Sequence, residues 1–344
     1  MHNAKIRYGL IGLGEVSEAH EKGYREILDK VEIHAVCDVN QDVATRRAAA
    51  YDAEVYKDYK ELLDDPDVEA VDIMVPHYLH FEIAKAALQK NKHVLIEKPL
   101  AVKSREAMEL CEIARDRGVK FTVAENTRFV KAYMEAEKLI KAGALGELRL
   151  IRTFIYGTEM IRIQDQANWI HNEVKSGGGA MMDMAAHTFY LIKWLFGEID
   201  DVVANEWRLI PYIEVPDNAT ISGRLRNGAI YSTQYTMTVE VPWGERLEVY
   251  GSRGSIIIDQ LNNPPAKFYQ DRMDFDGKPL ENVPYDPVEW KTSSMVAEVK
   301  DFAQAIRDDR SPAIDPLEAY YVIQAIEKAY ESAEKGRSVY MASS

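Results

Sequence analysis

The first third of the chain alternates short apolar runs with stretches of helical periodicity. The apolar runs are rich in Val and Ile, which is typical of strands buried on both faces of a parallel sheet. Two helical stretches, residues 81–90 and 105–117, lie among them, and Ser104 is placed to cap the second. The expected strands cover residues 6–11, 33–37, 70–75, 93–96 and 120–123. This alternation predicts an α/β domain whose parallel sheet is covered by helices.

A different pattern follows a helix expected over residues 131–142, which ends at Gly143. Several later runs alternate apolar and polar residues, as strands with one solvated face do. These expected strands cover residues 148–156, 202–209, 219–225, 229–236, 245–250 and 255–259. Arg226-Asn227-Gly228 separates two of them and fits a tight hairpin turn, because Asn-Gly tolerates positive φ. We therefore expect a second, α+β domain with a large, mostly antiparallel open sheet.

Length and composition agree with two globular domains. The 344 residues exceed the size at which one core usually stops growing, and we divide the chain into residues 1–125 and 126–344. The net charge of −14 and the lack of a Lys/Arg stripe argue against a nucleic-acid partner. No apolar run approaches the ~20 residues of a membrane helix, so no membrane partner is expected. The chain starts directly in a strand-like run without a secretory signal, which predicts a cytoplasmic location.

The two cysteines, Cys37 and Cys111, have no CxxC or Cys/His ligand spacing. Each falls in a segment that should be buried. We therefore interpret them as apolar side chains of the core and expect neither a disulfide nor a zinc site.

Gly12-Leu13-Gly14-Glu15-Val16 stands between the first expected strand and a helical run, where a dinucleotide-binding fold places its phosphate turn. Gly12 permits the tight turn, and Gly14 lets the backbone approach a pyrophosphate. Ser17 is small enough for close helix packing at the position of the usual third glycine. The helix start offers backbone amides and a positive dipole end. These residues are predicted to bind the cofactor, although an ordinary strand-to-helix turn is the alternative.

Asp38 ends the second expected strand, where a carboxylate can accept hydrogen bonds from both ribose hydroxyls of NAD. The same carboxylate would repel the 2′-phosphate of NADP. Val39 and Asn40 supply no arginine for that phosphate, while Arg46 and Arg47 are near in sequence. The sequence favours NAD, with NADP possible, over the alternative of a solvated strand-end Asp.

Glu97-Lys98-Pro99 follows a strand expected in the parallel sheet, at the carboxyl edge where such sheets bind ligands. An ammonium there can hydrogen-bond a substrate hydroxyl and stabilise developing negative charge on its oxygen. Pro99 restricts the backbone of Lys98. We predict that Lys98 is catalytic; an ordinary surface loop is the alternative.

Three glycines, Gly177-Gly178-Gly179, open a helix that carries Asp183 and His187 four residues apart on one face. A histidine with a pKa close to neutrality suits proton transfer from a hydroxyl, and Asp183 can orient it. A structural hydrogen bond between the two is one alternative, and two ligands of a metal site is another. The sequence offers no strong third ligand, so we predict catalysis and no metal.

These landmarks together resemble the Gfo/Idh/MocA oxidoreductases, which include glucose-fructose oxidoreductase and inositol dehydrogenase. The matching segments are GLGEVSEAH (12–20), Asp38, Pro76 with His80, EKP (97–99) and GGGAMMDMAAH (177–187). The resemblance implies a Rossmann domain, a second domain whose open sheet forms homodimers or homotetramers, and Lys98, Asp183 and His187 as the catalytic set. It also implies cofactor contacts from Pro76, His80, Glu97, Lys98 and Asn126. The chain departs from the family at His77, where Asn is common.

The expected activity is transfer of hydride between a nicotinamide and a secondary hydroxyl of a sugar, sugar derivative or cyclic polyol. Residues proposed to read the substrate hydroxyls are Tyr156, Arg162, Trp169 and His171, for which core packing or surface charge is the alternative. A reductase of a non-sugar carbonyl or imine would use the same nucleotide half. A catalytically inactive nucleotide-sensing regulator is a third possibility, against which Lys98 and His187 argue.

Overall fold

The chain forms two compact units. The computed structural model describes residues 5–157, 165, 168–270, 276–281, 283 and 286–342. One unit contains Met1–Arg128 and Thr292–Tyr320, and the other contains Phe129–Lys291 and Tyr321–Ser344. The expected division into 1–125 and 126–344 therefore missed the return of residues 292–320 to the first unit.

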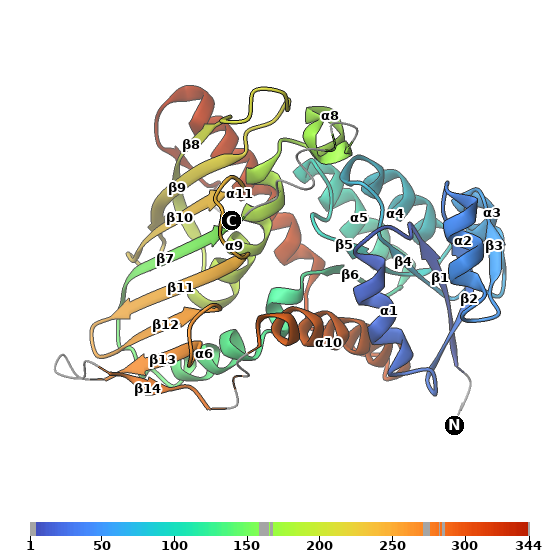
Figure 1. The fold of residues 1–344 in the computed structure, drawn as a ribbon, viewed down its shortest axis with the longest axis horizontal. Helices are drawn as coiled ribbons and strands as arrows, with labels where there is room; N and C mark the ends of the chain where they lie inside the picture. The colour runs from blue at the N-terminus through green and yellow to red at the C-terminus, as the bar shows by residue number, and fades with distance from the viewer. Residues whose placement is uncertain are drawn as a thin grey trace. The chain divides into compact units, whose positions relative to one another are not determined.

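The first unit contains a six-stranded sheet in the order β3-β2-β1-β4-β5-β6, with every pair parallel (Figure 1). The strands are β1 (Ile6–Ile11), β2 (Val31–Cys37), β3 (Glu54–Tyr56), β4 (Ala70–Ile73), β5 (His93–Glu97) and β6 (Phe121–Ala124). The helices are α1 (Ser17–Arg25), α2 (Gln41–Ala48), α3 (Tyr59–Asp64), η1 (His77–Leu79), α4 (His80–Gln89), α5 (Ser104–Arg117) and most of η2 (Asn126–Phe129). The strand order reverses between β1 and β4, which marks the ligand-binding edge of such sheets. The predicted Rossmann arrangement is confirmed.

Helix α10 (Pro287–Arg307) adds its later turns to the core of the first unit. Tyr8, Tyr24 and Phe302 are at most 1% exposed, and the ring centroid of Tyr8 lies 5.0 Å from that of Tyr24 and 6.5 Å from that of Phe302. Gly23 permits close packing of α1, because a Cβ there would lie 2.9 Å from the Cβ of Val299. Apolar side chains distant in sequence thus place residues 292–320 in this unit.

The second unit contains a nine-stranded sheet in the order β14-β13-β12-β11-β7-β10-β9-β8-β15. Its strands are β7 (Leu148–Tyr156), β8 (Ile199–Trp207), β9 (Asn218–Leu225), β10 (Ile230–Thr236), β11 (Gly244–Gly251), β12 (Ser255–Asp259), β13 (Ala266–Tyr269), β14 (Lys278–Pro279) and β15 (Val339–Tyr340). Its helices are α6 (Lys131–Lys141), η3 (Trp169–His171), α8 (Glu173–Ser176), α9 (Ala180–Phe196) and, from Tyr321 onward, α11 (Pro316–Lys335). Among the described strands, β7 and β10 are parallel and the other pairs antiparallel, as predicted.

The two faces of this sheet differ. Figure 1 shows α9 along one face, where it contacts β7, β8, β9 and β10. Thr153 and Tyr235 point to that face, and Thr188 of α9 hydrogen-bonds the Tyr235 hydroxyl. Alternate residues, such as Arg152 and Phe154, point to the opposite, open face.

Several element boundaries differ from the prediction. The hairpin is confirmed, because Gly228 has φ +87° between β9 and β10. Ser104 is the first residue of α5 rather than its cap, and Lys103 precedes it without a capping side-chain bond. Strands β3, β13, β14 and β15 were not expected; each spans four residues or fewer, too short for a clear periodicity.

Two predictions drawn from composition can be compared with the structure. Cys37 and Cys111 are buried, as interpreted, and burial raises the pKa of each thiol to about 12. No helix within the described ranges is long and apolar enough to cross a membrane.

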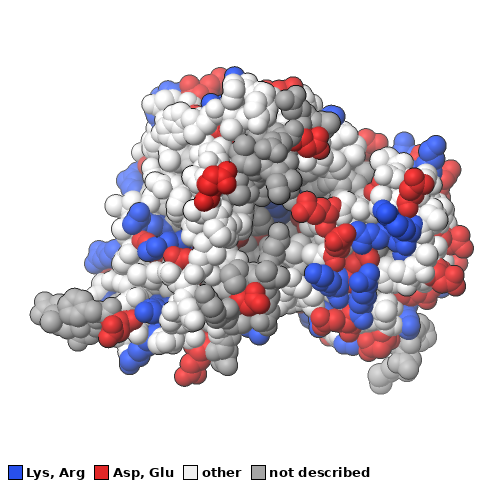
Figure 2. All heavy atoms as spheres, in the orientation of Figure 1, with Lys and Arg blue, Asp and Glu red and all other residues white. Residues whose placement is uncertain are grey.

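On the face that Figure 2 shows, Lys and Arg lie among Asp and Glu over the region of α1 and α2. There Arg47 pairs with Glu18 and Glu21, each at 2.9 Å.

Candidate active site

The glycine turn between β1 and α1 has the geometry of a phosphate-binding loop. Gly12 has φ +85°, and a Cβ there would lie 2.5 Å from the Met74 carbonyl oxygen. A Cβ at Gly14 would meet no heavy atom within 4 Å, so the space beside this backbone is open. Ser17 is fully buried and its Oγ donates to the Gly14 carbonyl at 2.6 Å, which explains a small residue at this position. The turn and the start of α1 therefore fit a dinucleotide pyrophosphate.

Asp38 stands directly after β2, beside this turn. Its Oδ2 accepts a hydrogen bond from the Leu13 N–H at 2.7 Å, and its Oδ1 accepts one from the Asn40 N–H at 2.7 Å. The carboxylate is half-buried, whereas Val39 is 91% exposed. Since a carboxylate oxygen can accept more than one hydrogen bond, these contacts orient Asp38 and leave acceptor capacity for ribose hydroxyls. Leu13 and Val16 contribute apolar packing, and the side chain of Glu15 is exposed.

Lys98 follows β5 at the same carboxyl edge of the parallel sheet. It is half-buried, the Lys98-Pro99 peptide is cis, and the Lys98 N–H donates to Glu97 Oε2 at 3.0 Å. The other carboxylate oxygen, Oε1, lies 3.0 Å from Nε2 of His20 in α1. Burial opposes the charged form of Glu97, but the hydrogen bond and charge of His20 outweigh it and lower the pKa of Glu97. The predicted catalytic lysine is thus attached to a buried polar network.

His80 was expected to contact the cofactor, and the structure shows contacts between its ring and the backbone. The side chain is completely buried. Its Nδ1 lies 2.7 Å from the Pro99 carbonyl oxygen and its Nε2 lies 2.8 Å from the Val75 carbonyl oxygen. These contacts fix the segment that follows Lys98, and a contact between His80 and the cofactor stays a prediction. Pro76 remains half-buried at the start of η1, and buried His77 packs against the His80 ring.

Asn126, the remaining cofactor candidate, lies in η2 after β6. Its side-chain amide donates to the Ser294 Oγ of α10 at 2.9 Å. Asn126 therefore links α10 to the segment after β6. A contact between Asn126 and the cofactor stays a prediction.

The glycine loop before α9 requires its three glycines. Gly177, Gly178 and Gly179 have φ values of +79°, +132° and +78°, in a region that residues with a Cβ rarely adopt. A Cβ at Gly178 would lie 2.2 Å from the hydroxyl oxygen of Tyr330, and one at Gly179 would lie 2.6 Å from the Pro216 carbonyl oxygen. The loop thus packs against α11 and starts α9 in a defined direction.

Asp183 and His187 lie on an otherwise buried helix. Thirteen of the 17 residues of α9 are buried, while Asp183, His187, Lys193 and Trp194 are half-buried. At about 100° per residue, Asp183, His187 and Trp194 share one stripe. The predicted pair therefore occupies one accessible face of α9. Lys98 belongs to the first unit and this pair to the second, so their joint action on one substrate stays a prediction.

The substrate candidates fall in different places. Arg162 lies outside the described residues. Trp169 and His171 form η3, where Trp169 is half-buried and His171 is buried at 7% exposure. Tyr156 packs against Phe154, with ring centroids 4.6 Å apart, on the open face of the sheet. Since α9 covers the other face, Tyr156 is separated from Asp183 and His187 within one chain.

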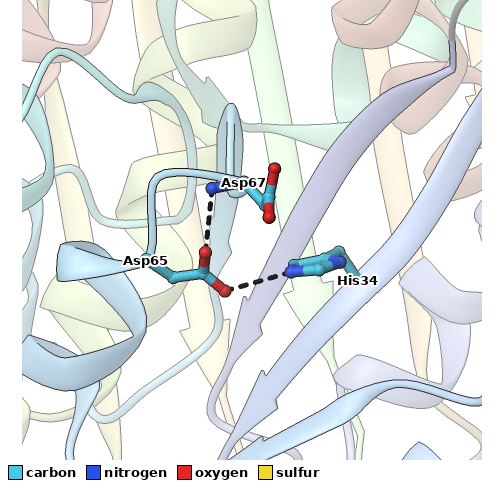
Figure 3. A group of neighbouring side chains, drawn as sticks. All are labelled: His34, Asp65 and Asp67. Atoms are coloured by element: carbon cyan, nitrogen blue, oxygen red, sulfur yellow. Dashed lines mark hydrogen bonds and ion pairs between the residues drawn. The ribbon is translucent and has the colours of Figure 1, made fainter.

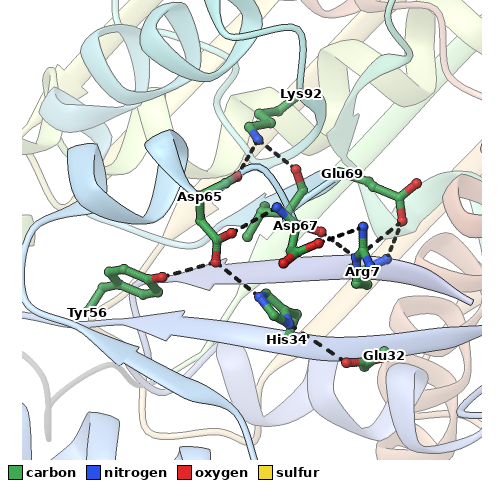
Figure 4. Close-up of polar contacts among 9 residues, drawn as sticks. Arg7, Glu32, His34, Tyr56, Asp65, Asp67, Glu69 and Lys92 are labelled. Carbon is green, nitrogen blue, oxygen red and sulfur yellow. Dashed lines mark hydrogen bonds and ion pairs between the residues drawn. The ribbon is translucent and has the colours of Figure 1, made fainter.

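His34, Asp65 and Asp67 offer three ligand atoms within 4.8 Å of one another (Figure 3). Figure 4 shows that each is already engaged. Asp65 accepts hydrogen bonds from the Tyr56 hydroxyl and the Asp67 N–H, both on its carboxylate, and contacts His34 at 3.0 Å. Asp67 pairs with Arg7 at 3.1 Å. These contacts make the group a hydrogen-bond network that ties β2 to the segment before β4.

Two residues that support the site were not predicted from the sequence. His20 belongs to the GLGEVSEAH segment, but its partners come from β4, β5 and α10. Tyr330 packs beneath Gly178, and its position far along the chain gave no signal. For His20, the available sign was a histidine on the same helix face as Gly23 and Tyr24, which are buried.

Two family models match the chain. The model described as "Oxidoreductase family, NAD-binding Rossmann fold" matches residues 6–125, and the model described as "GFO/IDH/MocA C-terminal domain" matches residues 133–257. Both carry the same family name, and together they extend over both units.

Relatives and solved structures point to the same group. Myo-inositol 2-dehydrogenase of Thermotoga maritima is 25% identical over 340 residues, which cover 97% of this chain and 98% of that protein. An uncharacterised oxidoreductase of Synechocystis is 34% identical over 235 residues, but this match spans only 62% of that relative and 64% of this chain. A levoglucosan dehydrogenase structure in complex with NADH and levoglucosan has a TM-score of 0.89 and 25% identity, covering 98% of this chain and 99% of that one.

Proposed function

The chain belongs to the Gfo/Idh/MocA oxidoreductases, and from this membership we propose that it is an NAD-dependent dehydrogenase of a sugar, sugar derivative or cyclic polyol. It would transfer hydride between a secondary hydroxyl carbon and the nicotinamide. The observation that carries the proposal is the glycine turn with Asp38 at the edge of β1 and β2, in a chain whose near full-length relatives include inositol and levoglucosan dehydrogenases.

The residues of the first unit fit the cofactor. The backbone of the Gly12–Val16 turn and the start of α1 would hold the pyrophosphate, and Asp38 would hold the ribose hydroxyls. The bound nicotinamide supplies a hydride acceptor. Relatives named for NAD and for NADP both occur among the inositol dehydrogenases. We propose NAD here because the Asp38 carboxylate would repel a 2′-phosphate.

Three side chains would act on the substrate. The Lys98 ammonium would hydrogen-bond the reacting hydroxyl and stabilise negative charge on its oxygen. His187 would take the hydroxyl proton during oxidation and return it during reduction, with Asp183 orienting the imidazole. The half-buried state of all three supports this assignment, because each retains access while being oriented by its surroundings.

The experiment is a screen of substrates with the purified chain. Inositols, free sugars, anhydrosugars and nucleotide sugars would be offered with NAD and with NADP, and reduced cofactor would be followed at its absorbance. We expect turnover of at least one polyol or sugar with NAD. Turnover confined to amino-acid semialdehydes or imines would favour the alternative reductase. Binding of NAD without any turnover would favour a nucleotide-sensing regulator.

We also propose a homodimer or homotetramer formed through the open face of the second sheet. Large apolar side chains on this face are exposed, with Ile230 at 54%, Trp207 at 49% and Val203 at 37%. Exposed apolar side chains on one sheet face favour association. Light scattering of the parent chain and of Ile230→Asp tests this, and a parent that is monomeric at micromolar concentration contradicts it.

A further inference from the structure

The inference concerns His20, a histidine of α1 for which the proposed reaction has no use. Its side chain is completely buried. Its Nδ1 lies 2.8 Å from Asp72 Oδ2 of β4, and its Nε2 lies 3.0 Å from Glu97 Oε1 of β5. An ionised carboxylate only accepts hydrogen bonds, so both ring nitrogens must carry a proton to make these two contacts. With both carboxylates ionised, the geometry fits an imidazolium.

The surroundings of His20 favour this charge. Burial alone lowers the pKa of His20, but the charges and hydrogen bonds of Asp72 and Glu97 outweigh it and raise the pKa well above the ordinary value. The titratable groups that face this cluster are Asp72 from β4, Glu97 from β5, Glu298 from α10, Tyr24 from α1, Tyr8 from β1 and, acting on Glu298, Glu125 after β6. Burial raises the pKa of Glu298, whose Oε1 lies 3.7 Å from His20 Nε2.

The hydrogen bonds around His20 do not form a path that carries protons to solvent through Asp72 and Tyr24. Beyond His20 lies Asp72, whose Oδ2 also accepts from the Tyr24 hydroxyl at 3.0 Å. Asp72 and Tyr24 are both completely buried. A chain of hydrogen bonds that ends in the core cannot deliver protons to solvent, so a role in holding geometry fits better than a role as a relay.

His20 is placed to fix the position of the segment that carries Lys98. One oxygen of Glu97 faces His20, and the other accepts the Lys98 N–H at 3.0 Å. On the far side of Lys98, His80 contacts the Pro99 carbonyl at 2.7 Å. The lysine is therefore flanked by two buried imidazoles, one acting through a carboxylate and the other on the backbone.

We propose that His20 is a positioning residue which, as a buried imidazolium, fixes the Glu97 carboxylate under the Lys98 amide and so sets the direction of the Lys98 side chain. This inference rests on the proposed function, in which Lys98 meets the substrate. His20 lies three residues after Ser17, in the helix whose first residues follow the phosphate loop. The same short helix would thus support both the cofactor loop and the lysine.

The kinetic test compares His20→Gln with a matched control. We expect kcat of His20→Gln to fall roughly tenfold or more, as loss of an orienting partner commonly does, with KM for NAD changed less than about threefold. The control is His34→Gln, which removes another histidine–carboxylate contact at 3.0 Å in the same unit. Its kcat should match the parent. Equal kcat in His20→Gln and the parent would overturn the proposal.

A second variant separates positioning from general loss of structure. In His20→Gln the Glu97 carboxylate loses its cation, whereas adding Glu97→Gln removes that charge and keeps an oxygen for the Lys98 N–H. We expect the double variant to recover part of kcat. If His20 matters only for folding, the two losses should add, and a double variant below both single variants would contradict positioning.

Two spectroscopic readouts do not depend on turnover. Nitrogen NMR of the parent should show both ring N–H groups of His20 at about pH 8, with the signal assigned by His20→Gln. Reductive ¹³C-methylation should give a Lys98 signal, assigned by Lys98→Ala, that changes in His20→Gln and not in His34→Gln. If no polyol is oxidised, the proposed function fails while these readouts still decide the inference. A neutral His20 ring or an unaltered Lys98 signal would refute it.

Discussion

Gly12 and Gly14 lie two residues apart in one turn, yet alanine at each position should have a different effect. Gly12 has φ +85°, and this left-handed region costs a residue with a Cβ about 1–2 kcal/mol. The added Cβ would also lie 2.5 Å from the Met74 carbonyl oxygen, so the end of β4 must shift. We expect Gly12→Ala to lower the free energy of unfolding by about 2 kcal/mol or more.

Gly14→Ala is the matched comparison. Its Cβ would meet no heavy atom within 4 Å and no positive φ is involved, so unfolding should change by less than about 1 kcal/mol. The methyl group would instead occupy the space that the proposed pyrophosphate needs. We expect the Kd for NAD to rise at least tenfold, which corresponds to about 1.4 kcal/mol.

Urea unfolding followed by circular dichroism and calorimetric titration with NAD measure both effects. The expected pattern is loss of stability at Gly12 and loss of affinity without loss of stability at Gly14. A Gly14→Ala variant that binds NAD as tightly as the parent would refute the assignment of this loop. A Gly12→Ala variant as stable as the parent would refute the steric reasoning.

Three further predictions concern the first unit. Asp38→Ala combined with Val39→Arg should shift the ratio of kcat/KM values from NAD towards NADP, and an unchanged ratio would count against the ribose assignment. Lys98→Ala should slow hydride transfer in single turnovers by orders of magnitude while the Kd for NAD stays within about threefold; equal single-turnover rates would remove the lysine from the mechanism. Burial raises the pKa of Glu298 above its unfolded value, so its neutral form favours folding below about pH 4.5 and this contribution is lost as the pH rises. Glu298→Gln should therefore gain stability relative to the parent as the pH rises above about 4.5, by at most about 1.4 kcal/mol per pH unit. A difference that stays constant with pH in urea unfolding would contradict the buried neutral carboxyl.

Much of the fold could be predicted from local patterns in the sequence. The strands β1, β4 and β5 were recognisable because burial on both faces favours runs of mostly apolar residues. The turn at Gly228 was recognisable because few residues tolerate its backbone conformation. In contrast, β3 has two exposed residues among three and leaves no hydrophobic signal.

The candidate site was predictable where chemistry and backbone geometry depend on neighbours in sequence. The phosphate turn and Asp38 belong to one short β-α-β segment, and the structure joins them through the Leu13 N–H. His20 escaped notice because its meaning depends on carboxylates from β4 and β5, more than 50 residues away. The position of Tyr156 on the open sheet face likewise depends on which face α9 covers.

The return of residues 292–320 has a practical consequence for exchanging parts between relatives. A fragment that ends at Arg128 would leave the rings of Tyr8 and Tyr24 without Phe302, and such a fragment should aggregate rather than fold. A chimera made by a single crossover near residue 128 would pair one parent's sheet with the other parent's α10. Recombination that keeps this core intact needs at least two crossover points, so that the late helix travels together with the strands it covers.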